Sequence, residues 1–264
     1  MTGEYYNKAF KKLEHRLNKY IKEYKLRIKD KDEREIEEEV FDESTLKTLY
    51  ILSNQNIIYE FYGVVATGKE SRIYAGKSGD GEPIAIKIFL IHTSEFRRGR
   101  LKYIMGDERF EGLSRAPHKL IYVWAQKEYK NLLKASKAKV YVPRPIACLN
   151  NVLVMEFIGD DFKPAPLLRE LREVSGYMLY QVLRQAMLLY RKAELIHTDL
   201  SEYNIFYYKR KPVLFDFGQA VLKTHPQADA FLVRDIGNIL NFFRGRGVDV
   251  DISIEEAIEY VKGG

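Results

Sequence analysis

The chain has 264 residues, of which 46% are hydrophobic, and a net charge of +6 at pH 7, which fits one large domain or two modest lobes with a sizeable core. The single cysteine, Cys148, excludes an internal disulfide framework, and the lack of any apolar run of about 18 residues argues against a membrane-spanning helix. The first residues, M-T-G-E-Y-Y-N-K, lack the apolar core of a signal peptide, so we expect a cytoplasmic protein without a membrane partner.

The N-terminal region is strongly charged. Residues 1–29 carry nine Lys or Arg against three Glu, and their apolar residues recur every three or four positions, which predicts a helix. The apolar stripe consists of Leu13, Leu17, Ile21, Tyr24 and Ile28. We favour a solvated helix docked through this stripe over a basic arm for RNA or a protein partner. Residues 30–43 are mostly acidic, so residues 1–43 are interpreted as a charged helical extension.

Residues 44–89 begin with a helix and continue with strands. Ser44 or Thr45 is expected to cap a helix that runs to about Leu52, because both side chains can accept hydrogen bonds from free helix N–H groups. β-Branched and aromatic runs follow, and the turn S-G-D-G-E-P separates the last two of them. The expected strands span residues 57–65, 72–76 and 83–89. This pattern indicates an antiparallel sheet.

A long irregular segment follows these strands. Residues 91–117 contain three glycines and the basic run R-R-G-R, and a loop of this length is usually functional or disordered. A helix is predicted from Pro117 to Ala138, followed by two strands at residues 140–147 and 151–158.

Beyond Gly159 helices predominate. The expected helices span residues 167–174, 177–194, 229–244 and 254–261, and two short strands span residues 204–208 and 212–216. We therefore predict an α+β chain with an N-lobe at residues 44–155 and a C-lobe at residues 156–264, joined near Glu156–Gly159. Nucleotide and substrate sites favour the junctions of such lobes.

The strand region contains two groups suited to an anion. In G-V-V-A-T-G-K-E-S-R-I-Y, a glycine turn could form a phosphate nest to which Lys69 and Ser71 add contacts, although such a turn alone is more often just a hairpin. It is not a Walker A loop, because Glu follows Gly-Lys. Lys87 ends the apolar run I-A-I-K, so it is either an edge lysine that reaches water or a buried lysine paired with a carboxylate, for which Glu128 is the candidate.

The stretch I-H-T-D-L-S-E-Y-N-I, Ile196 to Ile205, concentrates polar residues between apolar segments. Asp199 and Asn204 lie five positions apart, and Asp216 in L-F-D-F-G follows at a strand end, which suits Mg²⁺ with its preference for oxygen ligands. His197 is expected to pack rather than to bind a metal. The order of glycine turn, strand Lys, helix Glu, D-x-x-x-x-N and D-F-G is that of the protein-kinase signature.

With these motifs the sequence resembles the RIO family of atypical serine/threonine protein kinases, and within it the first subgroup in an archaeal-type form. The resemblance covers residues 45–245 and rests on T-G-K-E-S-R-I-Y, I-A-I-K, Y-I-M-G-D-E-R-F, W-A-Q-K-E-Y-K-N-L, L-V-M-E-F-I-G, H-T-D-L-S-E-Y-N and D-F-G-Q-A. It implies a trimmed bilobal kinase fold with an antiparallel N-lobe and a mostly helical C-lobe. It also implies that the chain binds ATP and Mg²⁺ or Mn²⁺, and that it acts in maturation of the small ribosomal subunit.

The resemblance also assigns roles to individual residues. Lys87 would contact the ATP phosphates and pair with Glu128, and Asp199 would be the catalytic base. Asn204 and Asp216 would hold the metal, and Asp216 would also accept a phosphoryl group transiently during ATP hydrolysis. The remaining nucleotide contacts would come from Thr67, Gly68, Lys69 and Ser71 in the phosphate loop, and from the backbone of Glu156 and Ile158 at the adenine.

Departures from ordinary protein kinases refine this expectation. Thr198 replaces the arginine of H-R-D, which weakens the case for coupling to a phosphorylated activation loop. No A-P-E segment follows D-F-G, and only thirteen residues separate Gly218 from Leu232. Asp235 in R-D-I-G-N-I is expected to brace the catalytic loop. We therefore expect an ATP-dependent kinase or ATPase switch that acts on precursors of the small ribosomal subunit, with their protein and rRNA.

Two other functions are weighed against this expectation. One is an RNA-binding assembly factor whose kinase fold is a nucleotide-gated clamp, motivated by the basic N-terminal region and by Arg97, Arg98 and Arg100. The mildly basic charge balance permits such a partner without demanding it. The other is a small-molecule phosphotransferase of related fold, which fits H-T-D-L-S-E-Y-N less well.

Overall fold

The computed structural model describes residues 42–90 and 117–263 of the chain. The interpretations of residues 1–41 as part of a helical extension and of residues 91–116 as a long loop fall outside these ranges. The described residues form two compact units: the first holds residues 42–90, 117–126 and 146–157, and the second holds residues 127–145 and 158–263. No helix within the described ranges is both long and apolar enough to cross a bilayer.

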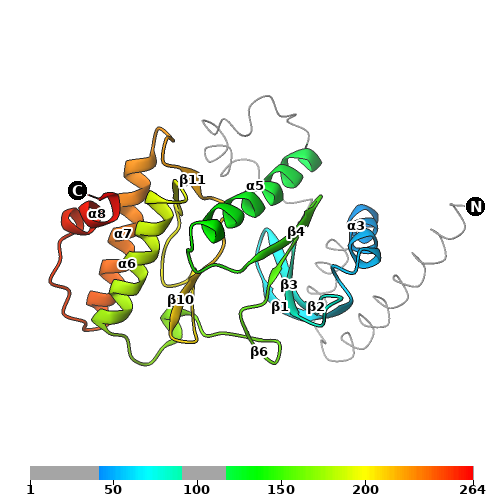
Figure 1. Ribbon diagram of the computed structural model, residues 1–264, viewed down its shortest axis with the longest axis horizontal. Helices are drawn as coiled ribbons and strands as arrows, with labels where there is room; N and C mark the ends of the chain where they lie inside the picture. The colour runs from blue at the N-terminus through cyan, green and yellow to red at the C-terminus, as the bar shows by residue number, and fades with distance from the viewer. Residues whose placement is uncertain (1–41, 91–116, 264) are drawn as a thin grey trace, which may run out of the picture. The chain divides into compact units, whose positions relative to one another are not determined.

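The first unit is built on a five-stranded sheet with the strand order β1-β2-β3-β5-β4 (Figure 1). Antiparallel pairing joins β1 to β2, β2 to β3 and β3 to β5, which confirms the predicted antiparallel sheet. The strands are β1 Glu60–Thr67, β2 Ser71–Lys77, β3 Pro83–Phe89, β4 Pro145–Leu149 and β5 Val152–Glu156. Since β3 has a neighbour on each side, its residues lie in the interior of the sheet.

One face of this sheet packs against helix α3, Glu43–Asn54. The core between them is formed by buried apolar side chains, among them Leu49, Leu52, Tyr74, Ile84, Ile86, Ile88, Val152 and Val154. The strand predicted to start at Ile57 begins only at Glu60. The N–H groups of Ile57 and Ile58 bond back to the carbonyl oxygen of Leu52 at 3.0 and 3.3 Å, because the chain is still leaving α3 at this point.

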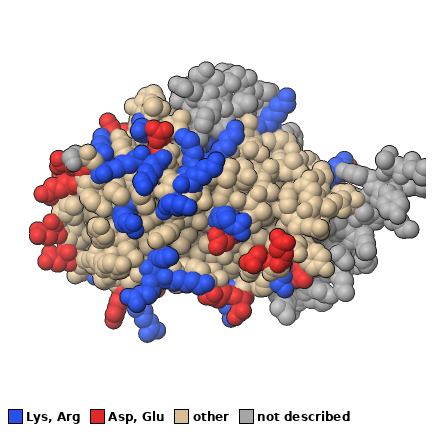
Figure 2. All heavy atoms as spheres, in the orientation of Figure 1, with Lys and Arg blue, Asp and Glu red and all other residues tan. Residues whose placement is uncertain are grey.

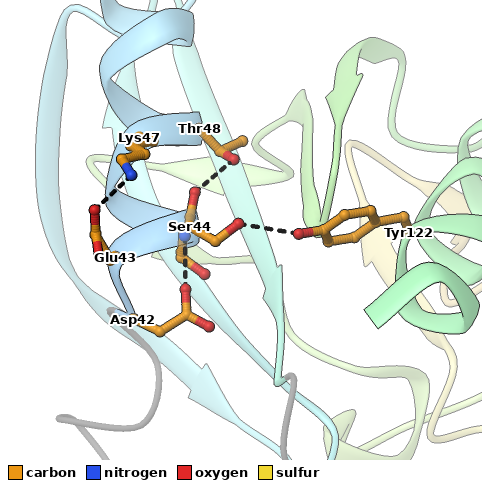
Figure 3. Close-up of polar contacts among 7 residues, drawn as sticks. Asp42, Glu43, Ser44, Lys47, Thr48 and Tyr122 are labelled. Carbon is orange, nitrogen blue, oxygen red and sulfur yellow. Dashed lines mark hydrogen bonds and ion pairs between the residues drawn. The ribbon is translucent and has the colours of Figure 1, made fainter. Parts of the chain in front are cut away.

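The N-terminus of α3 differs from the prediction. Asp42, rather than Ser44 or Thr45, caps the helix: its carboxylate accepts a hydrogen bond from the N–H of Thr45 at 2.7 Å (Figure 3). Asp is as good a cap as Ser, and its charge also favours the positive end of the helix dipole. The Ser44 hydroxyl instead forms a 3.0 Å hydrogen bond with the hydroxyl of Tyr122, which belongs to helix α5, Pro117–Lys137.

The second unit is mostly helical (Figure 1). It contains the second half of α5 together with α6 Gly176–Arg191, α7 Ala228–Gly245 and α8 Ile254–Lys262. Three short antiparallel pairs complete it: β6 Gly159–Asp160 with β7 Lys163–Pro164, β8 Leu195–Ile196 with β11 Val221–Leu222, and β9 Ile205–Tyr208 with β10 Lys211–Leu214. The β9–β10 hairpin confirms the two short strands that were predicted here.

The helix predicted for residues 167–174 is wrong. Only the single 3-10 turn η2, Leu168–Glu170, forms there. The guanidinium group of Arg246 donates to three backbone carbonyl oxygens of residues 169–172, at distances between 2.5 and 3.3 Å. A side chain thus occupies carbonyl groups that would otherwise accept from helical N–H groups, while the fully buried Leu168 anchors the segment.

Gly159, which opens β6, has a backbone conformation that a side chain would not tolerate. Its φ is +154°, and a Cβ atom there would lie 2.0 Å from the carbonyl oxygen of Lys163. We expect Gly159→Ala to lower the free energy of unfolding by about 2–3 kcal/mol, because the atoms that the Cβ would meet belong to the backbone and cannot rotate away as a side chain could. Urea denaturation measures this loss. The matched control is Gly176→Ala at the start of α6, where a Cβ atom has no neighbour within 4 Å, and equal effects of the two substitutions would contradict the prediction.

Candidate active site

The polar loop, residues 197–204, lies between β8 and β9 and is held by α7. The carboxylate of Asp235 accepts hydrogen bonds from the N–H of Thr198 at 2.7 Å and from the N–H of Leu200 at 3.1 Å. Thr198 is fully buried and has a φ of +69°, a conformation that costs a residue with a Cβ atom about 1–2 kcal/mol. The brace predicted for Asp235 is therefore confirmed, and the backbone that it holds is strained.

Two further side chains of α7 hold the same backbone, and sequence reasoning missed both. Arg234 donates to the carbonyl oxygen of Thr198, and Asn238 Nδ2 donates to that of Leu200 at 3.3 Å. The residues on either side of Asp199 therefore have both their N–H and their C=O groups bonded to α7. The spacing R-D-x-x-N is the signal that could have found them, because residues four apart lie on one face of a helix.

The β9–β10 hairpin brings three predicted site residues together within the second unit. Asn204 precedes β9 and Asp216 follows β10, and the first residue of β9 pairs with the last residue of β10. The N–H of Phe215 donates to the carbonyl oxygen of Asn204 at 3.1 Å. Asn204 Nδ2 in turn donates to the carbonyl oxygen of Asp199 at 2.8 Å and to its carboxylate Oδ2 at 3.1 Å. One amide side chain thus joins Asp199 to the hairpin end that carries Asp216.

The oxygen atoms at this hairpin end fit a small, hard cation. Both N–H bonds of the Asn204 amide are directed at Asp199, which leaves the amide oxygen as the atom that could bind a metal. Asp216 is exposed and adds a carboxylate. Within the described residues, no group of three His, Cys, Asp or Glu could hold a metal by itself. This set suits Mg²⁺, which binds few protein ligands and completes its shell with phosphates and water.

Asp199 has surroundings that suit proton transfer. Desolvation raises the pKa of its carboxyl group above the ordinary value, and the negative charge of Asp216 raises it as well. The hydrogen bond from Asn204 opposes this shift. Because a general base works best when its pKa approaches the working pH, a raised pKa favours this role for Asp199.

His197 is a packing group, as predicted. Its side chain is buried, and its Nε2 atom lies 2.9 Å from the carbonyl oxygen of Phe215. Its ring meets that of Phe217 edge-on, with the centroids 4.7 Å apart. Burial lowers the pKa of the imidazole, so the neutral form is favoured. His197 therefore links the polar loop to the chain around Asp216 without entering the chemistry.

The predicted phosphate loop lies in the first unit, between β1 and β2. The N–H of Gly68 donates to the carbonyl oxygen of Ser71 at 2.9 Å, which closes the turn. Thr67, Gly68 and Lys69 are exposed. A Cβ atom on Gly68 would meet only the Ser71 carbonyl oxygen, at 3.4 Å, so the turn itself does not require glycine. The absent side chain instead lets an anion approach the backbone of the turn closely.

Lys87 lies in the interior of the same sheet. It is only 6% exposed, and its cross-strand neighbours are Ile73 on β2 and Leu153 on β5. The interpretation as an edge lysine that reaches water is therefore wrong, because β3 is a central strand. Side chains alternate along a strand, so Lys87 lies on the face opposite to Ile86 and Ile88, which pack towards α3.

The other predicted nucleotide contacts are divided between the units. Glu128 is buried in the second unit, so its pairing with Lys87 in the first unit stays a prediction. Glu156 is the exposed last residue of β5 in the first unit. Ile158 belongs to the second unit, and its carbonyl oxygen accepts a hydrogen bond from the N–H of Ala165 at 2.9 Å. This leaves the N–H as the group of Ile158 that could meet adenine.

The stability of the chain should depend on pH through Asp235. Desolvation by burial raises its pKa from 3.8 to about 7, and the two backbone N–H groups oppose this shift. Between these pH values the folded state binds more protons than the unfolded state, so the free energy of unfolding falls as the pH rises. We expect a loss of about 2–3 kcal/mol between pH 5 and 8 relative to Asp235→Asn, which lacks this titration.

Urea denaturation of both proteins at the two pH values measures the effect of Asp235. The comparison with Asp235→Asn cancels the titration of all other groups in the chain. A difference between the two proteins that does not change with pH would contradict the raised pKa.

The chain is similar in sequence to the RIO domain and to several kinases that contain it. A sequence profile that describes the RIO domain matches residues 72–257. The RIO-type serine/threonine-protein kinase Rio1 of Haloferax volcanii is 41% identical over 229 residues, which cover 87% of this chain and 79% of that protein. The protein of the same name from Methanocaldococcus jannaschii is 35% identical over 248 residues, with 92% and 84% covered. The human serine/threonine-protein kinase RIO1 is 38% identical over 240 residues, but these span only 42% of the human protein.

Solved structures give the fold. The Rio2 kinase of Chaetomium thermophilum, in a complex with ADP, Mg²⁺ and phosphoaspartate, is similar with a TM-score of 0.64 and 22% sequence identity. The match covers 83% of this chain and 66% of that chain. At this identity the likeness establishes the fold alone, and it confirms the predicted α+β kinase-like class.

Proposed function

Because this chain belongs to the RIO family of serine/threonine protein kinases, we propose that it transfers the γ-phosphoryl group of ATP with Asp199 as base and with Mg²⁺ bound by Asn204 and Asp216. One observation carries this assignment. The Asn204 amide donates both of its N–H bonds to Asp199, and the backbone carbonyl of Asn204 accepts from the N–H of Phe215, the neighbour of Asp216 in the chain. Base and metal ligands are thereby fixed to each other before any nucleotide binds.

The site residues of the second unit have distinct tasks in the proposed reaction. Asp199 takes the proton of a substrate hydroxyl group. The oxygen of that hydroxyl group bonds to the γ-phosphorus while the bond between the γ-phosphorus and ADP breaks. Asn204 and Asp216 would hold Mg²⁺, or Mn²⁺ in its place, which would neutralise phosphate charge. Asp235 contributes indirectly, because it fixes the backbone on both sides of Asp199.

The first unit supplies the proposed phosphate contacts. In this proposal the backbone of the β1–β2 turn, with Lys69 and Ser71, binds the ATP phosphates, and Lys87 adds a positive charge. The pairing of Lys87 with Glu128 stays the prediction made from the sequence. Positioning and charge neutralisation provide most of the catalysis in phosphoryl transfer, so little covalent chemistry is required of the protein. The buried, central position of Lys87 supports this role, since an unpaired charge there would be costly.

We also propose that the chain hydrolyses ATP through Asp216. A carboxylate oxygen of Asp216 bonds to the γ-phosphorus, ADP leaves, and water then cleaves the acyl phosphate. The related Rio2 kinase complex contains phosphoaspartate together with ADP and Mg²⁺, which supports such a step. The thirteen residues between Gly218 and Leu232 leave little chain for a peptide-binding groove, which favours an ATPase switch over broad protein phosphorylation.

The proposed partner is a cytoplasmic precursor of the small ribosomal subunit. Figure 2 shows Lys and Arg side chains gathered on one face of the second unit, while Asp and Glu gather at the edge near α8. Such a basic face supports contact with rRNA phosphates. The residues that motivated a purely RNA-binding function, the N-terminal region and Arg97, Arg98 and Arg100, lie outside the described ranges, so that alternative stays a prediction.

Turnover assays with pre-ribosomal particles test the proposal. ATP consumption should require Mg²⁺ and should rise when small-subunit precursors are added. Absence of Mg²⁺-dependent turnover would reject the enzyme assignment, whereas turnover that ignores the precursors would remove the ribosomal partner. In parallel, affinity for rRNA should fall steeply with salt, by a log–log slope of about −0.7 per single-strand phosphate contacted. Salt-independent or absent binding would remove the RNA contact.

A further inference from the structure

Two buried polar side chains of α5 hold the backbone of the metal loop, residues 216–220. Lys127 Nζ donates to the carbonyl oxygen of Gly218 at 2.9 Å and to that of Ala220 at 2.5 Å. Asn131 Nδ2 donates to the carbonyl oxygen of Phe217 at 2.9 Å and to that of Ala220 at 3.0 Å. All of these residues belong to the second unit. Four hydrogen bonds thus join one helix to the three carbonyl groups.

The burial of these donors makes the arrangement selective for one loop conformation. Lys127 and Asn131 are both 0% exposed, so an ammonium group and an amide have been withdrawn from water. A buried polar group that loses its partner carries the full cost of desolvation, and hydrogen bonds from charged donors are stronger than neutral ones. Another conformation of the metal loop would have to break these four buried hydrogen bonds.

The same helix carries Glu128, the residue proposed to hold Lys87. Lys127 and Asn131 are four positions apart and share one face of α5, while Glu128 lies about 100° further round the helix. Movement of this half of α5 away from the metal loop would break all four hydrogen bonds. Within the second unit, the position of Glu128 and the conformation of the metal loop are therefore tied together.

We propose that Lys127 and Asn131 are positioning residues that set Asp216 for Mg²⁺ before the metal or the nucleotide arrives. This inference rests on the proposed function, because it takes Asp216 as a metal ligand. A phosphorylated activation loop usually orders the metal-binding segment of a kinase. Here the buried side chains of Lys127 and Asn131 carry out that task. The chain then needs no covalent modification to order its metal loop.

Lys127→Met tests the proposal, because it keeps the length of the side chain and removes all of its donors. The Mg²⁺ concentration that gives half-maximal turnover should rise about tenfold, the lower end of the range for groups that orient metal ligands. Excess Mg²⁺ should restore most of kcat, and affinity for ATP without metal should not change. Asn131→Ala should shift the Mg²⁺ requirement in the same direction, and it carries the test if Lys127→Met does not fold. Lys137→Met, an exposed lysine in the last turn of α5, is the control and should match the unaltered chain.

Hydrogen–deuterium exchange of residues 216–222 provides a readout that does not depend on activity. Exchange should be faster in Lys127→Met and unchanged in Lys137→Met. A Lys127→Met protein with lower thermal stability but an unaltered Mg²⁺ requirement would overturn the positioning role. If the unaltered chain itself shows no Mg²⁺-dependent turnover, the proposed function is rejected together with this inference. If the unaltered chain shows Mg²⁺-dependent turnover and Lys127→Met has the same Mg²⁺ requirement, only this inference is rejected.

Discussion

Asp199→Ala should slow phosphoryl transfer by about 10²–10⁴-fold, the contribution that a general base usually makes, while the chain still binds ATP and Mg²⁺. The loop should survive the change. Its backbone on both sides of Asp199 is held by α7, and Asn204 retains its 2.8 Å bond to the carbonyl oxygen of residue 199. Single-turnover transfer from labelled ATP measures the rate, and equilibrium binding of a fluorescent ATP analogue measures the affinity.

Glu202→Gln is the matched control for Asp199→Ala. It removes a negative charge from the same loop, at a side chain to which no role in the reaction is assigned. It should leave the rate close to that of the unaltered chain. Full turnover by Asp199→Ala would show that the base is another group. Loss of ATP binding in that variant would mean that the loop had rearranged, and the rate would then say nothing about proton transfer.

Asp216→Asn should abolish turnover almost completely, because one carboxylate is both a proposed metal ligand and the proposed phosphoryl acceptor. Charge stabilisation by a bound metal is worth several kcal/mol, and each 1.36 kcal/mol is a factor of ten, so we expect a loss of about 10³-fold or more. After incubation with ATP, the unaltered chain should carry an acid-stable phosphate that hydroxylamine removes. Asp216→Asn should carry none.

Asp161→Asn is the control for the Asp216 substitution. Both aspartates are exposed and have a left-handed backbone, with φ of +49° at Asp161 and +62° at Asp216, and Asn tolerates that conformation well. The two substitutions therefore make the same chemical change in similar backbones. Asp161→Asn should keep both turnover and labelling. Unchanged labelling of Asp216→Asn would place the phosphate on another residue and reject this part of the proposal.

The parts of the fold with a strong local signal could be predicted from the sequence. The β-branched and aromatic runs between residues 57 and 89 predicted the first three strands, and two short apolar runs predicted the strands that form the β9–β10 hairpin. The positions of Asp199, Asn204 and Asp216 followed from motif spacing, because a short hairpin brings its two ends together whatever surrounds it. For these features, local geometry is sufficient.

Features that depend on distant contacts could not be predicted in this way. The segment at residues 167–174 has helical propensity, but Arg246, more than seventy positions away, takes its carbonyl groups. Lys127 looks like a solvated lysine in W-A-Q-K-E-Y-K-N-L, yet it is buried. The carbonyl groups that it binds lie about ninety residues further along the chain, so the local sequence does not reveal them. The spacing R-D-x-x-N places Arg234 and Asn238 on one face of a helix, but it does not tell which backbone carbonyl groups they bind in the polar loop.

The division of the chain into two units has a consequence for its synthesis. The first unit lacks β5, which pairs with the central strand β3, until residues 152–156 have been made, and by then residues 127–145 of the second unit have already been translated. A nascent chain emerging from the ribosome therefore cannot complete its first unit before it has started its second. Domains that are contiguous in sequence can fold one after the other during translation. These two units share helix α5, so segments of both must wait, partly folded, until the remaining strands and helices have been made. No single cleavage site would separate the two units from each other with the described segments of each kept together.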